Sequence, residues 1–222
     1  MAARFEPLPG GHGGHGGHGD PGDPGGGREG GAALALDPAE LSILRSLVVQ
    51  LLELVGPPGA AGDGSDGGTD PLEALFAEGP TEPPSDPALA RLFPDAYGGP
   101  GDSPDEETRR WAAEFRRFTE PDLRTRKRED GLAVVRSLDA VAADGSVPGG
   151  GGVVRLDAEG ARRWLGTLND LRLAVGARLG IEDDETSDRL IALPDHDPRK
   201  PMAMAYLWLG LLQESLLETL MT

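Results

Sequence analysis

The chain has 222 residues with 34 Gly, 20 Pro, no Cys and a formal net charge of −17. This length allows one domain or at most two small ones, and we expect a single domain over residues 1–222. The lack of cysteine excludes disulfides, Cys-ligated zinc, Fe–S clusters and thiol nucleophiles. The negative charge argues against non-specific binding of the whole molecule to nucleic acid or an anionic membrane, but it leaves room for a local basic patch.

Most of the glycine is concentrated in three stretches, which we interpret as a low-complexity Gly/His loop at 9–31 and Gly-rich linkers at 56–69 and 144–152. The loop holds three Gly-Gly-His triplets, which either form a flexible insertion or bind Ni²⁺ or Zn²⁺ loosely. The chain starts without the apolar core of a secretion signal. Its longest apolar run, 202–212, is about half of a membrane span. We therefore expect a cytoplasmic protein with no membrane partner.

The first predicted elements are two short strands near 4–7 and 33–36, followed by a long helix. Asp37, Pro38 and Glu40 are typical of a helix start, with an N-cap, Pro at the first helical position and Glu at the third. Apolar residues then recur at helical spacing up to Val55. The same opening chemistry predicts two short helices, one after Asp70 and one after Asp86.

A second long helical stretch is predicted from Ser103, with Pro121 breaking or kinking it and a new helix running to about 143. A strand at 153–156 and a helix capped by Asp157 repeat the arrangement at 33–55, so the two strands could pair. The last helix, 202–220, is apolar on nearly all sides through Leu212, which places it at the centre of a bundle. The predicted fold class is mainly α, a helical bundle with a minor two- or three-stranded β-sheet.

The strongest functional candidate is a basic cluster, in which eight of the 21 basic residues fall within twenty positions. Trp111, Phe115 and Phe118 share one helical face, which we expect to be buried, so that the arginines before Pro121 form a basic outer surface. Such a surface either binds a partner's carboxylates or phosphates or is simply solvated. The candidate partner-binding residues are Arg109, Arg110, Arg116, Arg117, Arg124, Arg126, Lys127 and Arg128.

Catalytic constellations are scarce in this sequence. No phosphate-binding loop, dinucleotide fingerprint or nucleophile elbow occurs. The acidic run 182–185 lacks the spacing of a calcium loop, and we expect it to be a solvated acidic loop. His196, between Asp195 and Asp197, is either an acid/base or pH-sensing group or part of a solvated turn. We expect one tryptophan on each of three long helices to share burial. The sequence predicts no enzyme, no cofactor and no metal site.

A set of short segments carries a family resemblance. They are 37–40 with 44–47, 70–72, 84–89, 91–97, 114–120, 164–173 and 197–201. As a set they resemble an actinobacterial family, formerly of unknown function, that includes an oxidative stress regulator. The resemblance covers nearly the whole chain apart from the Gly-rich stretches. It implies a transcriptional co-regulator that acts with a stress-responsive alternative sigma factor of RNA polymerase, promoting expression of genes for a sulfur-carrier route to cysteine.

In one respect the chain departs from the family pattern. The family regulator is associated with a redox-sensing Cys-x-x-x-Cys pair, and this chain has no Cys with which to form it. We expect a non-enzymatic co-regulator of the oxidative stress response that contacts a sigma factor or RNA polymerase, with DNA reached only indirectly or through a local basic patch. The alternatives are a direct DNA-binding regulator that uses the Arg109–Arg128 surface, and a small metal-binding protein or enzyme around His196.

Overall fold

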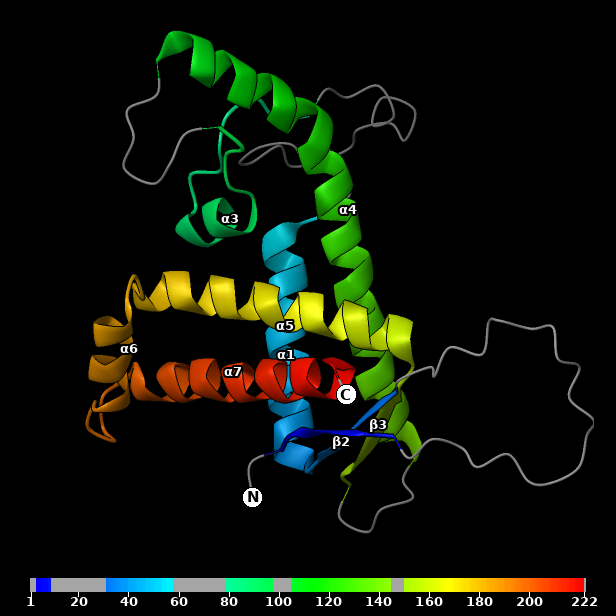
Figure 1. Cartoon of the computed structure of the whole chain (residues 1–222). Coiled ribbons are helices and arrows are strands. Elements are labelled where there is room, and N and C mark those ends of the chain that lie inside the picture. Colours follow the sequence, from blue (N-terminus) through cyan, green and yellow to red (C-terminus); the bar gives the residue numbers. More distant parts are fainter. Residues whose placement is uncertain (1–2, 9–30, 58–78, 98–104, 145–149, 222) are drawn as a thin grey trace, which may run out of the picture.

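The computed structural model describes residues 3–8, 31–57, 79–97, 105–144 and 150–221, which form a mainly α structure with one small sheet (Figure 1). The predicted fold class is confirmed. Most of the Gly/His segment 9–31, most of the two Gly-rich linkers and the helix predicted after Asp70 lie outside the described residues.

The sheet is antiparallel and has the order β1 (Phe5–Pro7), β2 (Ala32–Leu36), β3 (Gly152–Leu156). Leu34 in the central strand lies opposite Phe5 on one side and Val154 on the other. Residues 32, 34 and 36 are buried, because alternate side chains of a strand point to the same face. The predicted strands are confirmed, and so is the pairing of the strands at 33–36 and 153–156.

Two long helices follow directly from these strands. In front of α1 (Pro38–Val55), Asp37 accepts from the Glu40 backbone N–H at 2.8 Å and Glu40 accepts from the Asp37 N–H at 3.0 Å, so the predicted capping box is present. Asp157 caps α5 (Ala158–Leu179) by accepting from the Gly160 N–H at 2.7 Å. Asp86 caps the short helix α3 (Pro87–Leu92) in the same way.

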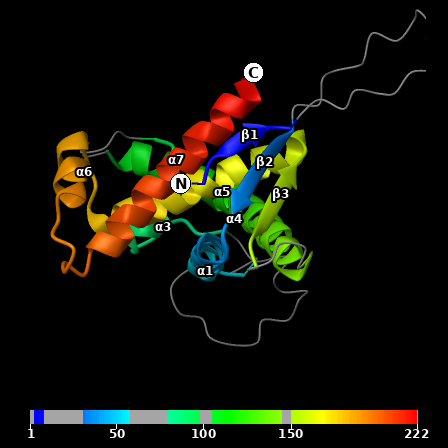
Figure 2. The same cartoon turned by 90° about the horizontal axis from the view of Figure 1, so that it is seen from below.

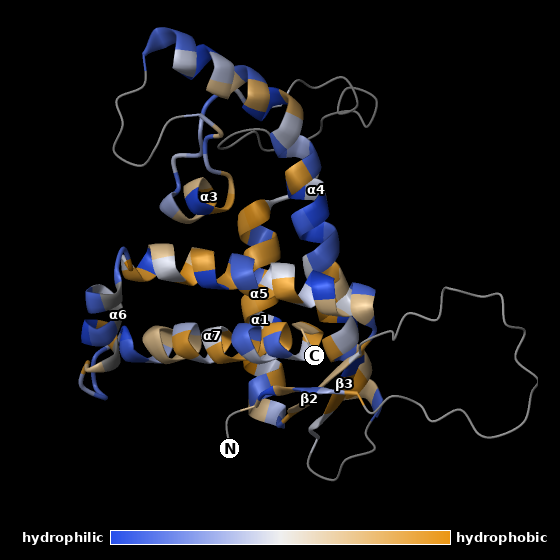
Figure 3. Cartoon of the chain, viewed as in Figure 1, coloured by the Kyte–Doolittle hydropathy of each residue, from blue (hydrophilic) through white to orange (hydrophobic). Residues whose placement is uncertain are grey.

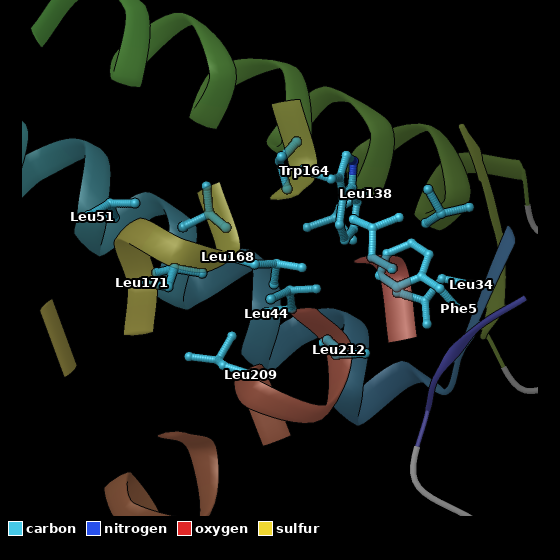
Figure 4. Close-up of a cluster of buried hydrophobic side chains, with 14 of the residues drawn as sticks. Phe5, Leu34, Leu44, Leu51, Leu138, Trp164, Leu168, Leu171, Leu209 and Leu212 are labelled. Atoms are coloured by element: carbon cyan, nitrogen blue, oxygen red, sulfur yellow. The ribbon is translucent and has the colours of Figure 1, made fainter. Parts of the chain in front are cut away.

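The hydrophobic core lies where α1, α5, α7 (Lys200–Met221) and the sheet meet (Figure 4). Trp164 of α5 is 1% exposed, and its ring meets Phe5 edge to face with centroids 5.6 Å apart. Leu44 of α1 and Leu212 of α7 are completely buried in the same cluster. Residues from both ends of the chain therefore share one core.

Helix α7 does not lie at the centre of the bundle, which corrects the expectation from its composition. The central helix is α5, which contacts α1, α3, α4 (Glu106–Asp144) and α7. In Figure 1, α5 and α7 lie side by side in front of α1, and Figure 2 shows β1 next to α7. Leu211 and Leu217 of α7 are about half exposed. No helix in the described residues is long and apolar enough to cross a membrane.

The acidic run predicted to be a loop instead begins a helix. Asp183 accepts from the Thr186 N–H at 2.7 Å and caps α6 (Asp184–Ile191), which connects α5 to α7. An aspartate with one carboxylate oxygen on a backbone N–H three residues later is a common helix start. Four consecutive acidic residues are more typical of a solvated loop, and this composition hides the helix start at Asp183.

The long helix α4 continues through Pro121 instead of ending there. Figure 1 shows it bent, with its first half passing over α3, and Figure 3 shows its middle mostly hydrophilic, unlike α1. Proline has no N–H, so the carbonyl of Arg117 four residues earlier loses its helical donor. Gly79 approaches that carbonyl so closely that a Cβ on it would lie 2.1 Å from the oxygen. Only glycine allows this approach.

Candidate partner-binding surface

The first half of α4 is held against the rest of the molecule by a buried arginine. The Arg116 side chain is 4% exposed and forms an ion pair with Glu120, which is 3% exposed. Arg116 also donates to the Phe93 carbonyl at 3.0 Å and to Asp95 at 2.8 Å. Buried charges persist only when they are paired and hydrogen-bonded. This guanidinium therefore fixes which face of the helix points inward.

A second arginine extends this network towards α1. Arg124 donates to Glu120 at 2.8 Å and to the carbonyl of Val55, at the end of α1, also at 2.8 Å. Its guanidinium lies 4.3 Å from the centre of the Phe93 ring, within the range of a cation–π contact. Helices α1 and α4 and the segment after α3 thus meet around Glu120.

Further along α4, two more basic side chains have partners within the fold. Lys127 binds Asp170 of α5 at 2.6 Å, and burial raises the pKa of that carboxyl despite the lysine. Arg128 donates to the carbonyl of Gly56 at 3.3 Å. These contacts join α4 to α5 and to the end of α1, so both side chains act in packing.

Because Arg116 points inward, the aromatic residues of the same helix point outward. Trp111, Phe115 and Phe118 are 47, 46 and 65% exposed. Tyr97, 44% exposed, lies beside them, with its ring centre 6.4 Å from Trp111 and 6.0 Å from Phe115. We call Tyr97, Trp111, Phe115 and Phe118 the aromatic surface. The expectation that this face is buried is wrong.

The eight predicted partner-binding residues therefore divide into two groups. Arg116 is buried, and Arg124, Lys127 and Arg128 are partly buried with the partners described above, so the expected outward placement of Arg116 is also wrong. Arg109, Arg110 and Arg126 are exposed. Arg117 is half-buried and lies over the Phe118 ring, 5.4 Å from its centre. The surface of α4 thus offers these four basic residues together with the aromatic surface.

The three tryptophans do not share one environment either. Trp164 is buried, Trp208 is half-buried and Trp111 lies on the aromatic surface. One signal for the true inner face of α4 is present in the sequence: Ala112, Arg116 and Glu120 recur every four residues. An arginine followed by a glutamate four residues later forms a pair on one helix face. The aromatic stripe beside it is more apolar and therefore masks this signal.

Comparison with known proteins places the chain in a family. The model of a domain of unknown function, DUF2017, matches residues 23–220. The chain belongs to this family. It is 31% identical over 195 residues to proteins named oxidative stress regulator AosR in Mycobacterium tuberculosis strain H37Rv and in Mycobacterium bovis, covering 84% of this chain and 81% of theirs. The predicted family resemblance is confirmed. No solved structure matches the chain.

In this DUF2017 protein the segment around His196 forms the turn before α7. Asp197 accepts from the backbone N–H, the Nε and the Nη2 of Arg199 at 2.9, 3.1 and 2.9 Å, and bonding to the Arg199 side chain is the main cause that lowers its pKa to about 2. His196 is exposed. Among the described residues, no three His, Asp or Glu side chains are grouped so as to hold a metal ion.

Proposed function

We propose that this protein regulates transcription in the oxidative stress response by binding another protein, and that it catalyses no reaction itself. The names of the mycobacterial relatives support the regulatory role. The partner that the family resemblance implies is an alternative sigma factor or RNA polymerase. The observation that carries the proposal is the aromatic surface on the first half of α4.

An exposed aromatic cluster is the kind of surface that protein partners cover. Aromatic and arginine side chains are enriched in interfaces, and a few of them supply most of the binding energy. Here Phe118 is 65% exposed and Arg117 stacks on its ring, so one site offers an apolar anchor and a cation. Burial of Arg116 and Glu120 turns this face outward, where a partner can reach it.

Replacing Phe115 and Phe118 together with alanine should abolish capture of the partner while leaving the fold intact. Loss of two anchors of about 2 kcal/mol each would weaken binding by roughly a factor of a thousand. The measurement is co-purification of sigma factor and RNA polymerase with the tagged full chain from its native host, with and without oxidant. Both side chains are about half exposed or more, so thermal stability should barely change.

The matched control is Ile43→Ala, which removes an apolar side chain of similar exposure (49%) from α1. This variant should capture the partner as the native protein does. Undiminished capture by the Phe115→Ala and Phe118→Ala double variant would place the contact elsewhere.

Direct DNA binding is the second candidate, because Arg109, Arg110, Arg117 and Arg126 remain on the surface. Half of the predicted basic cluster is held by internal partners, and the chain carries a net charge of −17. We therefore expect no binding to duplex DNA even at low salt, measured by fluorescence anisotropy. Binding that falls steeply as salt is added would favour the DNA interpretation, since each phosphate contact adds to the salt dependence.

A further inference from the structure

A second surface, separate from the aromatic surface, lies between α5 and α7. A groove of about 940 Å³ runs along these two helices, which lie side by side in Figure 1. Its apolar lining includes Leu173, Leu211 and Leu217, which are 36, 52 and 47% exposed. Large apolar side chains gathered on one exposed side of a helix pair are the kind of surface that another molecule covers.

The floor of the groove is shaped by two glycines. Tyr206 of α7 lies against Gly176, where a Cβ would be 3.3 Å from the ring. Arg172 of α5 lies against Gly210, where a Cβ would be 3.6 Å from the Arg172 Nε. Arg172 also donates to Gln213 at 2.7 Å. These contacts hold α5 and α7 together from within the groove. On its outer rim Leu211 and Leu217 are about half exposed, so no other element among the described residues covers them fully.

We infer that a second copy of this chain occupies the groove, so that the protein is a two-fold dimer with α5 and α7 of both copies forming a four-helix interface. The proposal concerns a different face from the proposed function and does not depend on it. Three properties of the groove favour a second copy over an unrelated partner.

The first property is the composition of α7. A helix that is apolar on nearly all sides belongs at the centre of a bundle, yet in the single chain α7 lies at its edge. A second copy packed on the groove covers the outer side of α7 and gives it the central position that its sequence favours.

The second property is shape. Met204, Leu207 and Leu211 follow one another along one side of α7. Met204 and Leu211 are 49 and 52% exposed, and the two leucines line the groove itself. A two-fold axis brings this row of one copy against the same row of the other, so that the side chains of each helix pack between those of its partner. Both helices have 22 residues, about 33 Å at 1.5 Å per residue. Two such helices side by side, each about 10 Å across with its side chains, give a face of about 33 by 20 Å, which approaches the ~800 Å² that each partner gives to a standard interface.

The third property is charge. The groove is lined by two basic residues and three acidic ones, so it is nearly neutral on a chain whose net charge is −17. Two copies therefore meet with little repulsion, and each offers both signs to the other. A strongly basic or acidic partner would find no matching surface here. The residues are Arg91, Arg172, Glu182, Asp183 and Glu214.

The test uses the mass of the full-length chain in solution, measured by light scattering and by sedimentation over a range of concentrations. The native protein should have twice the 23.2 kDa of one chain. Leu211→Glu should halve that mass, because Leu211 lies at the middle of α7 and charges in the interface core repel. Ile43→Glu, with an exposure of 49% on α1, is the matched control and should remain dimeric.

The absence of cysteine makes a direct geometric test possible. An antiparallel pairing along the whole of α7 brings the two copies of its middle residue together, so Leu211→Cys should give a covalent dimer on mild oxidation. Ile43→Cys should remain uncrosslinked under the same conditions. If Leu211→Glu unfolds, Leu217→Glu serves in its place. A native protein that is monomeric at all concentrations, or Leu211→Glu and Leu217→Glu variants that stay dimeric, would overturn the inference.

Discussion

Replacing Arg116 with alanine should lower the free energy of unfolding by about 3–5 kcal/mol, because it leaves the Glu120 carboxylate buried without its main counter-charge. Glu120 is 3% exposed and keeps only Arg124 as a partner. The Phe93 carbonyl and Asp95 lose a donor at the same time. For a chain of this size the melting temperature should fall by about 6–20 °C, at roughly 2–4 °C per kcal/mol.

A double variant separates the charge from the packing. Arg116→Met combined with Glu120→Leu fills the same space without burying either of these two charges, while Arg124 keeps its hydrogen bond to the Val55 carbonyl. Such replacements are often neutral or stabilising. We expect it to recover more than half of the loss in urea unfolding followed by circular dichroism. Arg110→Ala, at an exposed site on the same helix, is the control and should change the free energy by less than about 0.5 kcal/mol. An Arg116→Ala variant as stable as Arg110→Ala would show that the ion pair does not hold the helix.

The helix starts could be predicted from the sequence because the interactions that make them are local. Asp37, Asp86 and Asp157 each cap a helix by accepting a hydrogen bond from an N–H within three residues. The strands could be predicted for the same reason. Alternation along β2 marks its buried face, and a Gly- or Asp-containing segment bounds each strand. Such signals lie within one short window of the chain.

The inner face of α4 could not be predicted in this way. Its first half presents an aromatic stripe and a stripe of Ala112, Arg116 and Glu120, and local pattern alone favours burying the aromatic one. The outcome depends on the Phe93 carbonyl and Asp95, which lie more than twenty residues earlier and accept from Arg116. With partners supplied from a distance, an arginine becomes an inward side chain, and the candidate site changes from a basic surface to an aromatic one.

The position of α7 shows a similar limit. Its sequence correctly predicts a largely apolar helix, but it does not say whether the second apolar side meets the same chain or another molecule. In the structure one side of α7 packs on α5 and the core, with Leu209 and Leu212 completely buried. The other side, with Leu211, is half exposed. The sequence was therefore informative about how much surface α7 must bury and silent about what covers it.

Replacing Trp164 with alanine should cost about 3–5 kcal/mol of unfolding free energy, since a large buried side chain leaves a cavity that its neighbours only partly fill. Trp164 is 1% exposed and packs on Phe5, while its indole N–H donates to Ser137 of α4 at 3.1 Å. One side chain thus joins α5 to β1 and α4. We expect hydrogen exchange to rise first at the Phe5 amide, which donates to Ser215 of α7 at 3.0 Å.

Two further variants divide this effect into its parts. Trp164→Phe keeps most of the side-chain volume but removes the indole hydrogen bond, while Ser137 still donates to the Val134 carbonyl at 2.7 Å. Loss of this hydrogen bond should lower the free energy of unfolding by about 0.5–1.5 kcal/mol, in addition to the effect of the smaller ring. Trp111→Ala removes the same kind of side chain from a site that is 47% exposed. If packing against Phe5 fixes the sheet to the helices, Trp164→Ala must cost several times as much as Trp111→Ala in chemical unfolding. Equal costs would mean that the sheet is held by its strand pairing and by α7 alone.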